Sequence, residues 1–92
     1  MDPEQLKLVE EYASLFFTPE EIAILIDFSD EKLKKQLRKK DSDVYRAYMK
    51  GKLNTMMNIR RHQITLARNG SPKAEEYVEK LIRLQNSSES TM

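Results

Sequence analysis

The side chains best suited to binding a ligand are cations in the middle of the chain, directly after Ser29. At helical spacing within residues 30–39 stand Lys34, Lys35, Arg38 and Lys39. Lysine and arginine side chains in such a row bind phosphate oxygens through charge-assisted hydrogen bonds. The pattern predicts contact with a phosphate-bearing partner, with Ser29 at the front of the contact surface. The competing interpretation is a helix face that only solvent covers.

The charge distribution along the chain also favours an anionic partner. The formal net charge is only +1, but residues 30–68 carry twelve Lys or Arg against four Asp or Glu, whereas residues 1–29 carry seven acids and one lysine. Residues 69–92 are nearly balanced, with three bases and four acids. A basic block between acidic flanks concentrates positive potential in one region of the molecule.

The first residues of the basic segment limit what it can recognise. Asp30 and Glu31 precede the cations, at the end of the helix that would face base edges if the segment were a DNA-recognition helix. Carboxylates accept hydrogen bonds from cytosine but repel phosphate. We therefore expect binding to duplex DNA mainly through phosphate contacts, with modest sequence readout.

The composition offers little material for catalysis or for a metal site. The chain has no cysteine and a single histidine, His62, so thiolate sites are excluded and zinc would lack ligands. No glycine-rich phosphate loop is present, and most carboxylates stand at expected helix starts, where they favour the helix dipole. The sequence predicts a protein that is not an enzyme and has no cofactor or metal.

The elements that must position these residues are helical. Two glycines and three prolines in 92 residues, with abundant Leu, Lys and Glu, are typical of an all-α protein. Apolar residues recur every three to four positions, and caps and prolines divide the pattern into about five helices. Their expected ranges are 3–17, 19–26, 30–39, 43–69 and 72–86.

The segment 19–40 has the pattern of a helix-turn-helix. Thr18 can cap the first helix, Pro19 suits its first position, and Glu21 completes a capping box. The apolar run at residues 22–26 is short, so we expect it to be buried on most faces.

The contact between the two short helices is also visible in the sequence. Ala23 is small enough to let the helices approach, and Leu33 and Leu37 form the inner face of the second helix. Asp27 stands where such a turn usually has glycine. Because Asp tolerates the left-handed backbone conformation better than most residues, the turn is still expected to form.

The long helix expected at residues 43–69 carries more apolar surface than a compact three-helix unit can cover. A helix of about 25 residues is about 37 Å long, and only Gly51 weakens it, by about 1 kcal/mol relative to alanine. The last helix should pack back on it, and the remaining stripe should meet another copy of the chain. The predicted oligomer interface consists of Met49, Leu53, Met56, Met57 and Ile64.

Several short motifs follow the helix-turn-helix pattern. They are Gly51-Lys52, Arg60-Arg61, Ala67, Gly70-Ser71-Pro72 and Lys80-Leu81. With the preceding helices, residues 18–85 resemble the small terminase subunits of phages and related phage-type helix-turn-helix DNA-binding proteins. The resemblance implies a non-catalytic subunit that recognises duplex DNA for packaging, forms a homo-oligomer and works with a large terminase subunit, the packaging ATPase. Arg60 and Arg61 would extend the positive surface.

We expect one small domain with three parts. These are a helix-turn-helix unit at 1–42, a long-helix hairpin at 43–86 and a disordered tail at 87–92. No apolar run approaches the roughly 20 residues that span a bilayer, so we expect no membrane contact and a place in the cytoplasm of a bacterial host cell. Two alternatives to packaging are a helical protein-interaction module and a phage or mobile-element transcriptional regulator with a degenerate helix-turn-helix.

Overall fold

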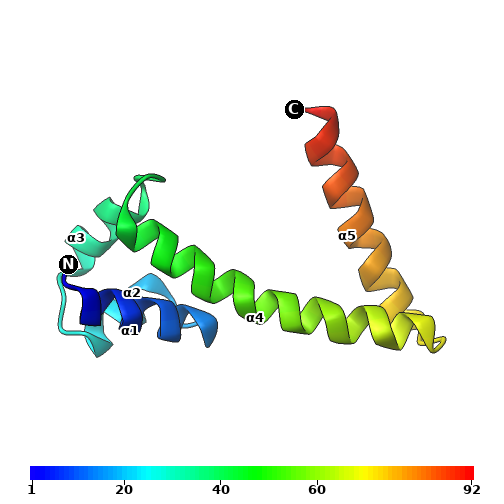
Figure 1. Cartoon of the computed structure of the whole chain (residues 1–92), viewed down its shortest axis with the longest axis horizontal. Helices are drawn as coiled ribbons and strands as arrows, with labels where there is room; N and C mark the ends of the chain where they lie inside the picture. Colours follow the sequence, from blue (N-terminus) through cyan, green and yellow to red (C-terminus); the bar gives the residue numbers. More distant parts are fainter. The chain divides into compact units, whose positions relative to one another are not determined.

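The computed structural model describes all 92 residues, which form five α-helices and no strand (Figure 1). The helices are α1 (Pro3–Ser14), α2 (Pro19–Leu25), α3 (Asp30–Leu37), α4 (Asp43–Arg68) and α5 (Pro72–Ser90). The predicted all-α class with about five helices is confirmed. The chain divides into two compact units, Met1–Met56 and Met57–Met92. The division therefore falls inside α4, whereas the sequence placed it at residues 42–43.

The helix starts follow the sequence signals. Asp2 and Gln5 form a reciprocal capping box at α1, in which each side chain accepts a hydrogen bond from the backbone N–H of the other residue. Thr18 and Glu21 do the same at α2. At α5, the Ser71 side chain accepts from the Ala74 N–H. Caps of this kind each stabilise a helix by about 1 kcal/mol.

Two helix ends differ from the expected ones. α1 ends at Ser14 rather than near residue 17, because Phe16 has a φ of 64° in the left-handed region. α5 continues to Ser90, well past residue 86, and so includes most of the segment 87–92 that was expected to be disordered. No glycine or proline interrupts residues 73–90, so nothing stops the helix from propagating.

The core of the first unit lies where α1, α2, α3 and the first turn of α4 meet. It consists of Val9, Ala13, Ile22, Ala23, Ile26, Leu33 and Val44. Tyr12 and Phe17 pack against it, and their rings meet edge to face with centroids 5.9 Å apart. This small core fixes the positions of α2 and α3 relative to each other.

The apolar run at residues 22–26 is buried on one side only. Ile22 and Ile26 face the core, but Ile24 is 75% exposed and Leu25 is 46% exposed. The expectation that this helix is buried on most faces is wrong. A helix of seven residues that packs on one side of a small helical unit leaves its opposite face in solvent.

Within the first unit, α1 and α4 approach each other very closely. Gly51 is buried, and a Cβ atom at this position would overlap the backbone carbonyl oxygen of Glu10. One turn later, the Thr55 hydroxyl donates a hydrogen bond to the carbonyl oxygen of Ser14 at the end of α1. The contacts at Gly51 and Thr55 tie α4 to the first unit as far as residue 56, which explains why the division lies beyond that point.

The second unit consists of the last part of α4, a turn at residues 69–71, and α5. Gly70 takes the predicted left-handed conformation, with a φ of 89°. The Ser71 N–H donates to the Leu66 carbonyl oxygen at 3.1 Å, and Ala74 in the first turn of α5 is buried. The two helices are thus held together at the turn. Further along they line an open groove.

Candidate nucleic-acid interface

The tight turn between α2 and α3 sets the position of the basic helix. Asp27 has a φ of 52°, so it occupies the left-handed conformation for which glycine is usual. The Phe28 N–H then donates to the Ala23 carbonyl oxygen at 2.9 Å. The Ser29 hydroxyl accepts from the Lys32 N–H at 3.3 Å and caps α3. The predicted helix-turn-helix shape is therefore present at residues 19–37.

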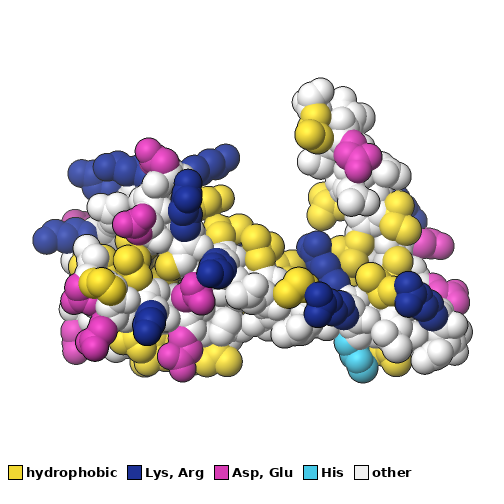
Figure 2. All heavy atoms as spheres, in the orientation of Figure 1, with side chains coloured by type: hydrophobic (Ala, Val, Ile, Leu, Met, Phe, Trp, Pro, Cys, Tyr) yellow, Lys and Arg dark blue, Asp and Glu magenta, His cyan; other side chains and the backbone are white.

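The exposed surface of α3 and the segment directly after it are rich in unpaired cations. Leu33 is 1% exposed and anchors the helix, with Leu37 partly buried beside the core. The exposed cations that form no ion pair are Lys32, Lys35, Arg38, Lys39 and Lys40. Figure 2 shows dark blue side chains gathered over α3 and the turn that follows it. We refer to these five cations as the α3 basic face.

Lys34 differs from the cations of the α3 basic face because two carboxylates hold it. Its ammonium group lies 2.8 Å from Glu20 on α2 and 3.2 Å from Asp30 on α3. The hydrogen bond to Glu20 raises the pKa of Lys34 above its ordinary value, and the hydrogen bond to Asp30 adds a smaller effect in the same direction. Lys34 therefore stays a cation at neutral pH, but its charge is already balanced within the protein.

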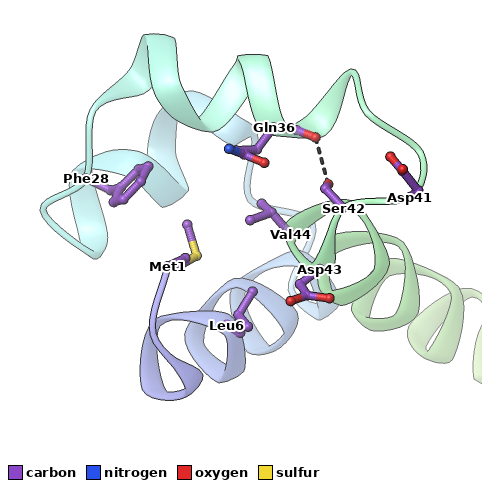
Figure 3. A pocket seen from close by; sticks show the side chains of 8 residues that line it. All are labelled: Met1, Leu6, Phe28, Gln36, Asp41, Ser42, Asp43 and Val44. Carbon is purple, nitrogen blue, oxygen red and sulfur yellow. Dashed lines mark hydrogen bonds between the residues drawn. The ribbon is translucent and has the colours of Figure 1, made fainter.

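The end of the basic helix is fixed by Ser42, as Figure 3 shows. The Ser42 hydroxyl donates to the Gln36 carbonyl oxygen at 2.8 Å and accepts from the Tyr45 N–H at 3.0 Å. One side chain thus closes the last turn of α3 and caps α4. This double role holds Arg38 and its basic neighbours close to the start of the long helix.

A cavity of about 300 Å³ lies beside Ser42 in the first unit. Its apolar lining comes from Met1, Leu6, Phe28 and Val44, and its polar lining from Gln36, Asp41, Ser42 and Asp43 (Figure 3). The two carboxylates lie on either side of Ser42 and are not directed at each other. No nucleophile with an adjacent base converges here, so the cavity offers no arrangement for catalysis.

The two predicted arginines of the second unit have different surroundings. Arg61 is exposed. Arg60 is partly buried, lines the groove between α4 and α5, and its Nε atom is buried without a hydrogen-bond partner. Arg61 therefore has the free surface position that a phosphate contact needs, whereas Arg60 faces the groove.

The predicted oligomer residues are spread over both units. Met49 and Met56 are half-buried in the first unit, and Leu53 in the same unit is 49% exposed. Met57 and Ile64, in the second unit, are 44% and 36% exposed. Apolar side chains therefore do reach the surface along α4, on both sides of the division.

Comparison with known proteins found no relative of this chain. No protein-family model, no curated protein and no solved structure matches the chain. Each of the five helices is too short or too polar to cross a membrane.

The sequence pattern missed Glu20 as a partner of Lys34. The two residues are 14 positions apart and lie on different helices, so helical periodicity carries no sign of the pairing. The only local hint was the i,i+4 spacing of Asp30 and Lys34, which often forms an ion pair on a helix. Lys32 and Lys40 were also left out of the predicted site, although both are exposed.

Proposed function

We propose that this chain is a non-catalytic protein that binds duplex DNA through α3, mainly by contacts to phosphates. The observation that carries the proposal is the α3 basic face, five exposed cations without an ion pair. Lys32 and Lys35 lie on a helix whose other side is anchored by Leu33 and whose start is fixed by a tight turn, and the other three cations follow directly after its last residue. A helix held in this way can be presented to a DNA groove.

The front of α3 supports phosphate contact more than base recognition. Asp30 and Glu31 occupy the first turn of the helix, where a recognition helix usually touches base edges. Most of the unpaired cations come just after the last residue of the helix, at Arg38, Lys39 and Lys40. Binding of this kind has modest sequence preference and falls steeply as salt is added, because each phosphate contact releases counterions.

The biological role that we propose follows the resemblance to phage small terminase subunits. The chain would act as a DNA-recognition subunit in packaging, as a homo-oligomer, together with a large terminase subunit in the bacterial cytoplasm. One electrostatic module of this size binds DNA weakly at physiological salt, and several on one scaffold gain affinity through their high effective concentration.

A protein-interaction module is the second candidate. It is favoured by the exposed apolar side chains of α2, above all Ile24 at 75%, and by the pairing of Lys34 with Glu20 and Asp30. In this case solvent alone covers the α3 basic face, and the apolar surface of α2 or α4 makes the contact with another protein.

Fluorescence anisotropy separates the two candidates. A labelled duplex of mixed sequence is titrated with the full chain at salt concentrations from about 20 to 200 mM. DNA binding predicts a saturable signal whose affinity falls steeply across this range. A flat signal at the lowest salt, with the protein folded by circular dichroism, would exclude DNA binding and favour the protein-interaction module.

A further inference from the structure

The second unit has an open groove between the last part of α4 and α5, lined by five apolar and four polar or charged residues. Its volume is about 460 Å³. Ile64 from α4 faces Val78, Leu81 and Ile82 from α5 across it. In Figure 2, hydrophobic side chains gather along the part of α5 and of α4 that border this space. Ile82 is 50% exposed, so nothing in the chain itself covers the groove.

Arg60 makes this groove different from a simple apolar surface. It lines the groove, and its Nε atom is buried without an acceptor. A buried guanidinium nitrogen without a partner is costly, because it has lost water and gained no hydrogen bond. An occupant that brings a carboxylate to the remaining N–H groups of the partly buried Arg60 would offset part of this cost.

The same groove contains a carboxylate of its own, Glu89, which forms no ion pair. Arg60 and Glu89 line the same groove, yet no ion pair joins them within the chain. Each side chain therefore has its charge available for a partner outside the chain.

We propose that the occupant is the groove of a second copy of this chain, which forms a twofold dimer in which Arg60 of each copy pairs with Glu89 of the other. A twofold interface needs a self-complementary surface, and this groove carries a cation, a carboxylate and apolar residues between them. Two second units packed on each other in this way bring four helices together. The dimer does not depend on DNA binding.

The spacing of the groove residues suits this packing. Along α4, Met57, Arg60, Ile64 and Ala67 recur at alternating steps of three and four residues. Along α5, Ala74, Val78, Leu81, Gln85 and Ser88 follow the same steps. This is the repeat by which helices pack in bundles, and polar residues within such a seam, here Arg60, Gln85 and Ser88, select the register and the number of helices.

The test is the mass of the full chain in solution, without DNA, from light scattering coupled to size-exclusion chromatography. The wild-type protein is expected to be a dimer. Arg60→Glu and Glu89→Arg should each weaken the dimer by tenfold or more, because each places like charges opposite each other. The double variant Arg60→Glu/Glu89→Arg restores opposite charges and should restore the dimer. Arg68→Glu, at an exposed position of α4 outside the groove, is the matched control and should keep the wild-type mass.

Two results would overturn the proposal. The first is a wild-type chain that stays monomeric up to about 0.5 mM, a concentration at which even a weak dimer of millimolar dissociation constant is partly formed. The second is a double variant that remains monomeric although both single variants and the double variant keep wild-type helix content by circular dichroism. A mass unchanged in both single variants would equally exclude the Arg60–Glu89 pair.

Discussion

At the scale of single residues, the important distinction is between cations that are free and cations that are already paired. Lys34 lies near the middle of α3, and Glu20 and Asp30 hold its ammonium group at 2.8 and 3.2 Å. Lys35, one residue later, is exposed and makes no ion pair. Lys34 and Lys35 look equivalent in the sequence, but the charge of Lys35 is free to bind a phosphate, whereas that of Lys34 is already balanced.

Replacement of Glu20 by glutamine is expected to strengthen DNA binding. The change removes the closest partner of Lys34 and a negative charge beside α3, so we expect an affinity gain of about two- to fivefold at low salt. Fluorescence anisotropy measures it. Glu4→Gln changes the net charge equally at an exposed position of α1 and should have a smaller effect. Equal effects of the two variants would mean that Lys34 takes no part.

Gly51→Ala is expected to destabilise the protein, although alanine is the better helix former by about 1 kcal/mol. The new methyl group would overlap the backbone carbonyl of Glu10, and overpacking of this kind costs about 1–3 kcal/mol. We expect the overlap to dominate, because the obstacle is backbone. Urea unfolding followed by circular dichroism measures the change. The exposed Asn54→Ala on the same helix should be neutral or stabilising, and a stabilised Gly51→Ala would contradict the close α1–α4 contact.

At the scale of elements, the turn between α2 and α3 determines whether the basic helix is presented at all. The capped start at Ser29, the buried Ala23 and the anchored Leu33 all hold α3 against α2. The weakest point is Asp27, a non-glycine residue with a φ of 52°. A residue other than Gly, Asn or Asp is strained in this conformation.

The effect of a substitution at Asp27 on stability should therefore depend on how well the new residue adopts the left-handed backbone conformation, and not on its hydrophobicity. Asp27→Gly lowers the small remaining cost of the left-handed conformation and should leave the stability equal to wild type or higher by up to about 1 kcal/mol. Asp27→Val, with a β-branched side chain, should lose about 1–2 kcal/mol. Thermal unfolding of both variants tests this order. If valine were as well tolerated as glycine, the left-handed turn would be absent in solution.

The elements could be predicted from the sequence wherever a local signal fixed them. A few adjacent residues determine each of these features, which are the caps at Asp2, Thr18, Ser29 and Ser71 and the turn at Gly70. Features that depend on contacts between distant residues could not be predicted.

Three features of the structure illustrate this limit. They are the Glu20–Lys34 pair, the exposure of Ile24 and the close approach at Gly51. Gly51 shows the difficulty most clearly, because in the sequence it is only a weak helix former. Its role is visible once α1 lies against it.

At the scale of the whole molecule, the two units have separate tasks in the function that we propose. The first unit presents the α3 basic face, and the second unit carries the groove with Arg60 and Glu89. A dimer through the second unit would supply two basic helices for one DNA molecule. The gain from the second helix depends on the effective concentration that the dimer provides.

For Glu89→Arg, dimerisation through the groove and simple electrostatics predict changes of opposite sign in the affinity for DNA. The change makes the net charge two units more positive, which by itself would tighten DNA binding. If the groove forms the dimer, the variant is monomeric and should bind DNA about tenfold more weakly or worse. Anisotropy titrations at the same salt and protein concentration compare it with wild type. A tighter complex would contradict the link between dimerisation and DNA binding.

The central claim, that the α3 basic face contacts DNA phosphates, is tested most directly by the salt dependence of the affinity. The slope of log K against log salt is compared for wild type, for Lys35→Ala/Arg38→Ala/Lys39→Ala, and for the charge-matched Lys7→Ala/Lys73→Ala/Lys80→Ala, whose three lysines are exposed outside α3. If each α3 cation neutralises one phosphate, the magnitude of the slope falls by about 2.7 in the α3 variant and stays near wild type in the other. Equal slopes in the two triple variants would contradict the claim.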